Sequence, residues 1–147
     1  MRRPLIYLLV LLTAWVTSAV VAAPDEQAAR ACAGMFGDAL SKGNASLLKT
    51  ILPGRGKVQM RLVRLGPEDG DFSAGQVQAV FDDFLKRGAV KSFQVVRVEY
   101  DKSGYALVRG RAELIDRSGR AGTVGLHLSL QPEGDRWILR GIRELSR

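Results

Sequence analysis

The sequence predicts an α+β fold in which three N-terminal helices pack into a curved antiparallel sheet. Two patterns carry this prediction. Apolar residues recur at helical spacing in the first part of the chain, and after Lys91 Asp-x-x-Gly turns separate long alternating segments. A chain of 147 residues forms at most one ordinary domain, and its single Cys excludes an intrachain disulfide framework and a Cys-based zinc cluster.

Residues 1–23 have the three parts of a secretory signal peptide. Arg2 and Arg3 precede an apolar run over 5–16, and the small residues Val21 and Ala23 suit signal peptidase. We expect cleavage near Ala23, which removes both Arg residues, lowers the formal charge from +7 to +5 and leaves one domain over 24–147. The mature protein would then be periplasmic or secreted, with no transmembrane span. An uncleaved membrane anchor over 5–23 is the alternative, because about 19 apolar residues can just span a bilayer.

Two helices are predicted at the start of the mature chain. One apolar stripe follows the i, i+3, i+4, i+7 spacing of a helix that begins at Pro24 and ends at Gly43: Ala28, Ala31, Cys32, Met35, Phe36, Ala39 and Leu40. Asn44 can cap a second, short helix that stops at Pro53.

The central part of the chain predicts a strand, a turn and the third helix. Residues 57–65 alternate between apolar and polar side chains, and the polar segment 66–71 is expected to be a turn. Ser73 and Gln76 form a capping box. The apolar stripe of the helix that follows consists of Val77, Val80, Phe81, Phe84 and Leu85, before Gly88.

Four strands are expected near 92–100, 105–115, 121–131 and 136–145. Their length predicts twisted or bulged strands in a curved sheet. Along 105–115 the apolar residues are small, including Gly110 and Ala112, which predicts a close approach of the third helix.

Several local motifs accompany this order of elements. The first helix is followed by Gly43-Asn44-Ala45-Ser46-Leu47-Leu48. The third helix carries a pattern of Ser73, Gln76, Val80 and Phe84, and the last predicted strand contains Trp137 and, eight residues later, Leu145. Together they resemble the nuclear transport factor 2-like superfamily, and within it small exported bacterial members of unassigned function. The resemblance covers nearly the whole mature chain. It implies a cone, with the sheet wrapped around the helices and a cavity that some relatives use for catalysis.

The candidate catalytic residues form no signature that we recognise. His127 is the only histidine, and with Asp38 and Tyr105 it is a weak candidate for acid–base chemistry in the cone. Glu68, Asp69 and Asp71 lack the ligand spacing of a calcium loop, and 52–57 lacks that of a phosphate loop. We therefore assign no catalytic residue and expect no metal and no cofactor.

The basic excess indicates a partner. Guanidinium groups in the predicted sheet suggest a partner-binding face, for which we select Arg97, Arg109, Arg111 and Arg140. Outside the cytoplasm such a face would meet an envelope protein or an anionic surface polymer. Nucleic acid is not expected, because no aromatic ladder accompanies the charges. A homodimer through the sheet is a further possibility.

These observations favour an exported, non-enzymatic binding or assembly module of the bacterial envelope. The alternative is a small-molecule lyase or isomerase that acts in the cone cavity. The two hypotheses differ in what fills the cone: a lyase or isomerase needs an open cavity with polar groups, whereas a binding module can have an apolar interior.

Overall fold

The computed structural model describes residues 24–65 and 68–145. The predicted signal peptide over 1–23 lies outside the described residues. The elements, in chain order, are α1 (Pro24–Ser41), the 3₁₀ helix η1 (Ala45–Thr50), β1 (Val58–Leu62), β2 (Glu68–Phe72), α2 (Ala74–Lys86), β3 (Val90–Tyr100), β4 (Ala106–Ile115), β5 (Ala121–Glu133) and β6 (Arg136–Glu144). The predicted helices and the four predicted C-terminal strands are all present, with ends shifted by a few residues.

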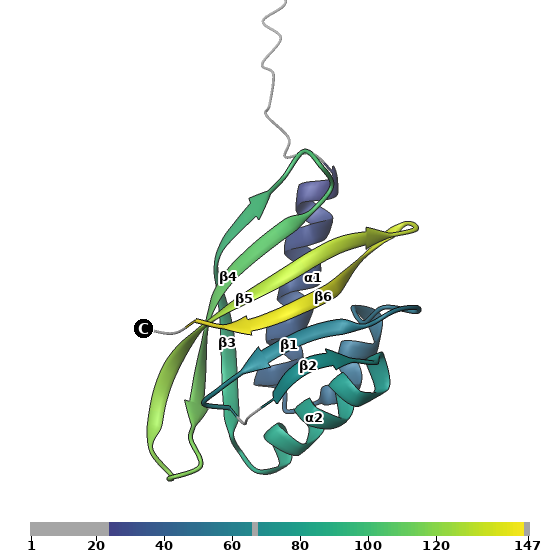
Figure 1. Ribbon diagram of the computed structural model, residues 1–147. Helices are drawn as coiled ribbons and strands as arrows, with labels where there is room; N and C mark the ends of the chain where they lie inside the picture. Colours follow the sequence, from purple (N-terminus) through teal and green to yellow (C-terminus); the bar gives the residue numbers. More distant parts are fainter. Residues whose placement is uncertain (1–23, 66–67, 146–147) are drawn as a thin grey trace, which may run out of the picture.

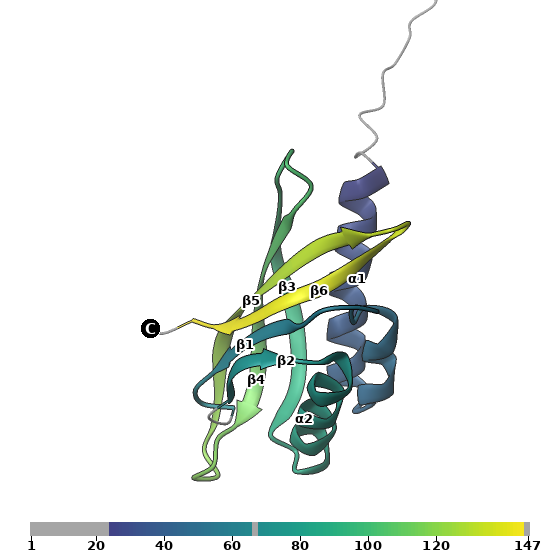
Figure 2. The same ribbon diagram turned by 45° about the vertical axis from the view of Figure 1, so that its right-hand side comes forward.

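The strands form one six-stranded sheet in the order β2-β1-β6-β5-β4-β3 (Figure 1). Every neighbouring pair is antiparallel except β1 and β6, which run parallel. The register shifts twice between β3 and β4 and once between β5 and β6, and such bulges bend and twist a sheet. The result is a curved sheet with the helices on one side (Figures 1 and 2).

Local chemistry explains where the helices begin. The Asn44 side chain accepts a hydrogen bond from the backbone N–H of Ser46 and thereby caps η1. The capping box at the start of α2 is present in both directions: Ser73 accepts from the Gln76 N–H, and Gln76 accepts from the Ser73 N–H. Both caps confirm the expectation from sequence.

An aromatic cluster fills the space between the helices and the sheet. Phe36 of α1 makes edge-to-face contacts with Phe81 of α2 and Phe93 of β3, at centroid distances of 5.6 and 5.0 Å. Phe81 also meets Phe84 edge to face, and all four rings are buried. The apolar stripe of the third predicted helix therefore faces the core, as expected.

The small residues of β4 make room for a different neighbour from the one expected. A Cβ atom on Gly110 would lie 2.0 Å from the ring of Phe93, so this ring occupies the space that we assigned to the third helix. A Cβ on Gly37 would lie 2.9 Å from the Phe93 carbonyl oxygen. The glycines thus allow the Phe93 ring to lie on β4 and α1 to pack closely on β3. The prediction that the third helix approaches the small residues of β4 was wrong.

The polar segment expected to be a turn contains a strand. β2 pairs with β1 in antiparallel register, from Val58 opposite Phe72 to Leu62 opposite Glu68. β2 forms an edge of the sheet, and its side chains are only half-buried or exposed. It consequently has no alternation of apolar residues that would reveal it in the sequence.

Candidate functional site

The sheet has one apolar face and one polar face. Alternate residues of β4 and β5, such as Val108, Ala112, Leu126 and Leu128, are buried on the side that carries the helices. The intervening residues lie on the opposite side, which we call the outer face. No helix within the described residues covers this face (Figure 2). The outer face is therefore available to a partner.

A row of basic side chains crosses the outer face. The register places Arg97 of β3 opposite Arg109 of β4, Arg109 opposite His127 of β5, and His127 opposite Arg143 of β6. The parallel pair then sets Arg143 opposite Arg61 of β1. Residues directly opposite each other in a sheet project to the same side. We call these five residues the cationic row.

Acidic side chains compensate only the two ends of the cationic row. Glu99 lies 3.2 Å from Arg97 and 3.9 Å from Arg109, and Asp69 lies 3.6 Å from Arg61. Arg143, near the middle, is exposed and forms no ion pair with any residue that the structure describes. The middle of the row therefore carries uncompensated positive charge.

His127 lies at the centre of the row. Its Nε2 atom is buried and has no hydrogen-bond partner among residues 24–65 and 68–145. Partial burial lowers the pKa of His127 below its ordinary value of 6.5, and the positive charges of Arg109 and Arg143 lower it further, against a smaller opposing effect of Glu99. The imidazole is therefore mostly neutral at pH 7.

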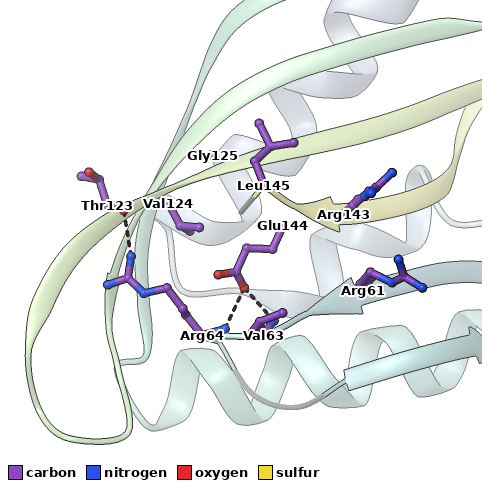
Figure 3. A pocket seen from close by; sticks show the side chains of 9 residues that line it. All are labelled: Arg61, Val63, Arg64, Thr123, Val124, Gly125, Arg143, Glu144 and Leu145. Carbon is purple, nitrogen blue, oxygen red and sulfur yellow. Dashed lines mark hydrogen bonds between the residues drawn. The ribbon is translucent and has the colours of Figure 1, made fainter. Parts of the chain in front are cut away.

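Beside the row, the outer face has a hollow of about 520 Å³ near the ends of β1 and β6 (Figure 3). Arg61 and Arg143 lie next to each other at one side of it. Val63 and Leu145 line it as well, with 71% and 36% of their surface exposed. The hollow thus has two guanidinium groups and two exposed apolar side chains.

Glu144 holds the wall of this hollow in place. Its carboxylate accepts hydrogen bonds from the backbone N–H groups of Val63 and Arg64, both at 2.8 Å, although the residue is only 7% exposed (Figure 3). The Arg64 guanidinium donates to the Thr123 carbonyl oxygen at 3.2 Å. These contacts tie the end of β1 to β5 and β6, so the hollow is formed before any ligand binds.

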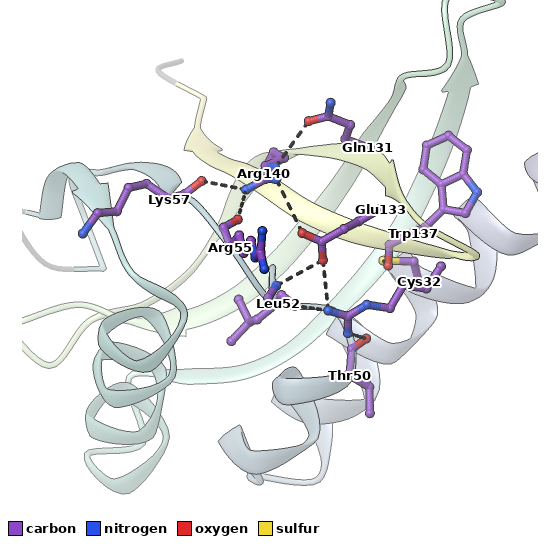
Figure 4. A network of polar contacts seen from close by, with 11 residues as sticks. Cys32, Thr50, Leu52, Arg55, Lys57, Gln131, Glu133, Trp137 and Arg140 are labelled. Carbon is purple, nitrogen blue, oxygen red and sulfur yellow. Dashed lines mark hydrogen bonds and ion pairs between the residues drawn. The ribbon is translucent and has the colours of Figure 1, made fainter.

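Arg140, which we selected with the partner-binding residues, is engaged elsewhere. It donates to the carbonyl oxygens of Arg55 and Lys57 and to the Gln131 side chain (Figure 4). Glu133 lies 3.8 Å from Arg140 and also accepts a hydrogen bond from the Gly54 N–H. These contacts anchor the loop over 53–57, the segment that we compared with a phosphate loop.

The three weak catalytic candidates are not brought together. Asp38 lies on the exposed side of α1, 4.0 Å from Lys42. Tyr105 is exposed between β3 and β4, and His127 is on the outer face, which is the opposite side of the sheet from α1. The space between helices and sheet contains the aromatic cluster together with other buried apolar residues such as Leu40 and Met60.

Two further findings concern metals and membranes. Within residues 24–65 and 68–145, no three His, Cys, Asp or Glu side chains are grouped as a metal site would require. None of the helices described there is long and apolar enough to cross a membrane.

Comparison with known proteins identifies the fold. No family model matches the chain, and no curated protein matches it. Solved structures do match. An NTF2-like protein from Anabaena variabilis superposes with a TM-score of 0.62 at 16% identity, covering 86% of this chain and 93% of that one.

Two further solved structures give similar results. A protein with a cystatin-like fold from Caulobacter vibrioides has a TM-score of 0.60 at 15% identity, over 80% of this chain and 86% of that one. A DUF4783 family protein from Bacteroides uniformis has a TM-score of 0.59 at 13% identity, over 78% and 95%. The chain therefore has the α+β fold of the nuclear transport factor 2-like proteins, as the sequence motifs predict.

Proposed function

We propose that this protein is a non-enzymatic binding module that holds an anionic partner on the outer face of its sheet. The cationic row is the observation that carries the proposal. It places four guanidinium groups and one imidazole in register across five strands, and the described residues neutralise only its ends. Guanidinium groups bind carboxylates, sulfates and phosphates with directed hydrogen bonds, and clustered charge accelerates association.

The apolar interior supports this proposal over the lyase or isomerase alternative. Either reaction needs a polar group that touches a bound substrate. The residues of the core between the helices and the sheet are hydrophobic, most of them Phe, Leu, Ile, Val and Ala, whereas the candidate acid–base residues face outward. We place the module in the bacterial envelope because of the predicted signal peptide, and its partner is then an envelope protein or an anionic surface polymer.

A homodimer through the same face would bring two cationic rows together. Like charges opposed in an interface are unfavourable. Two copies could therefore pair through this face only if an anion lay between their cationic rows and neutralised them. Such a dimer would occupy the surface that we assign to the anionic partner.

Charge reversal tests the proposed surface. Arg109 and Arg111 are two residues apart on β4, project from the outer face and are exposed. We expect the double variant Arg109→Glu/Arg111→Glu to lose at least about tenfold in affinity for immobilised dextran sulfate, mainly through the association rate. Wild-type binding should weaken as salt rises past the point where the Debye length is about 8 Å.

Neutral dextran is the control ligand and should bind neither protein. The free energy of unfolding of the double variant should lie within about 0.5 kcal/mol of the wild-type value, because exposed charges contribute little to stability. Equal binding of dextran sulfate by both proteins, or binding that does not respond to salt, would contradict the proposal.

A further inference from the structure

We propose that the hollow between the ends of β1 and β6 is a binding site for a small apolar monocarboxylate, a molecule with one carboxylate and a short hydrocarbon body. This inference rests on the proposed function in one respect, since Arg61 and Arg143 belong to the cationic row. The inference goes beyond the proposed function because it names a ligand of defined chemistry and size, whereas the cationic row alone indicates only a negatively charged partner.

The charged side of the hollow fits one anionic group. Arg61 and Arg143 lie opposite each other in the parallel pair of β1 and β6, so their guanidinium groups extend from neighbouring strands (Figure 3). The only acidic residue that lines the hollow is Glu144, and its Oε2 atom already accepts from two backbone N–H groups. A carboxylate that enters here meets Arg143, which has no ion pair among the described residues, and Arg61, whose partner Asp69 lies at 3.6 Å and does not line the hollow.

The apolar side of the hollow fits a hydrocarbon group. Val63 and Leu145 are two of the six large hydrophobic residues that are most exposed in the described chain, and both line this hollow. Gly125 of β5 lies beside Leu145: a Cβ atom there would be 2.9 Å from Leu145 Cδ1, so a larger residue at this position would displace the end of the leucine side chain. Covering Val63 and Leu145 removes apolar surface from water and favours binding.

The size of the hollow favours a small molecule over a polymer segment. Its volume of about 520 Å³ lies within the usual range for small-ligand sites, roughly 300–1,000 Å³. The wall needs no rearrangement, because Glu144 fixes residues 63 and 64 and Arg64 bonds to Thr123. A preformed site reduces the entropic cost of binding.

Octanoate is the probe ligand. Acetate, which has the carboxylate without the long chain, and 1-octanol, which has the chain without the charge, are the comparison ligands. We expect octanoate to bind at least about tenfold more tightly than either. In protein NMR spectra it should shift the backbone amide signals of Val63, Gly125 and Leu145. Octanoate that binds no better than acetate, or that shifts signals elsewhere in the protein, would overturn the inference.

Two pairs of variants separate the two halves of the site. Val63→Ser and Arg143→Gln should each weaken octanoate binding about tenfold. The matched controls Val96→Ser and Arg117→Gln, also exposed but outside the hollow, should leave it unchanged. If Val63→Ser has no effect while dextran sulfate still binds, this inference fails and the proposed function stands. If dextran sulfate does not bind but octanoate does, the proposed function fails and the small-ligand site stands.

Discussion

Phe81 is a fully buried member of the aromatic cluster. It contacts Phe36 and Phe84 edge to face and has no exposed surface. Replacing it with Ala removes both aromatic contacts and leaves a cavity, so we expect Phe81→Ala to lower the free energy of unfolding by about 3–5 kcal/mol. Urea denaturation followed by circular dichroism measures this. A loss below about 1 kcal/mol would show that the stripe of α2 does not face the core.

Cys32 is buried among apolar residues, and its Sγ lies 3.6 Å from the Trp137 carbonyl oxygen (Figure 4). Burial raises the pKa of this thiol to about 12. Since the thiolate is the reactive form, we expect Cys32 to react slowly with a disulfide reagent at pH 8 and rapidly once the protein is unfolded. Fast reaction of the folded protein would contradict the packing of α1 against β6.

At the scale of elements, Arg140 and Glu133 join the loop over 53–57 to strands β5 and β6. Replacing Arg140 with Gln removes the bonds to the Arg55 and Lys57 carbonyl oxygens. We expect a loss of about 1 kcal/mol in unfolding free energy, because the group is partly exposed, and a change in dextran sulfate affinity of less than about threefold. Arg136→Gln is a comparison within the same network, since Arg136 bonds to the Thr50 and Leu52 carbonyl oxygens. Unchanged stability of Arg140→Gln combined with lost binding would return Arg140 to the partner-binding surface.

The elements that the sequence predicts are those with a local signal. Caps at Asn44 and Ser73, apolar stripes and Asp-x-x-Gly turns all depend on residues a few positions apart. β2 was not predicted because its sequence Glu-Asp-Gly-Asp-Phe contains a single apolar side chain, so it has no apolar period, and the strand depends on pairing with β1. The wrong neighbour for Gly110 has a similar cause, since only tertiary packing places Phe93 over it.

In the candidate site, too, the sequence predicts what depends on neighbouring residues and misses what depends on the pairing of distant strands. Alternation along 105–115 puts Arg109 and Arg111 on the same side of one strand, and the structure agrees with that placement. Arg97 was selected only as another basic residue of the predicted sheet, and its pairing with Arg109 places it on the same face. The position of Arg61 in the cationic row was missed, because the parallel pairing of β1 with β6 joins segments about 80 residues apart. The alternating segment 57–65 did put Arg61 on a polar side, but nothing local indicates which strand lies beside it.

At the scale of the whole molecule, anion binding on the outer face of the sheet should depend on pH. An anion on the row screens Arg109 and Arg143 from His127 and adds a negative charge, and both effects raise the pKa of His127. Protonation of His127 and anion binding favour each other, because the coupling between the two is reciprocal. The affinity for the anion should therefore rise as the pH falls through the pKa that His127 has in the complex.

Titration of the His127 ring by NMR tests this central claim most directly, because the chain has one histidine and so gives one set of imidazole signals. We expect the pKa of His127 to lie below 6.5 in the free protein and to be higher when the protein is saturated with dextran sulfate. Arg143→Gln should raise the pKa of the free protein and reduce the shift on binding. A pKa at or above 6.5 in the free protein, or one that dextran sulfate leaves unchanged, would show that the cationic row does not bind anions beside His127.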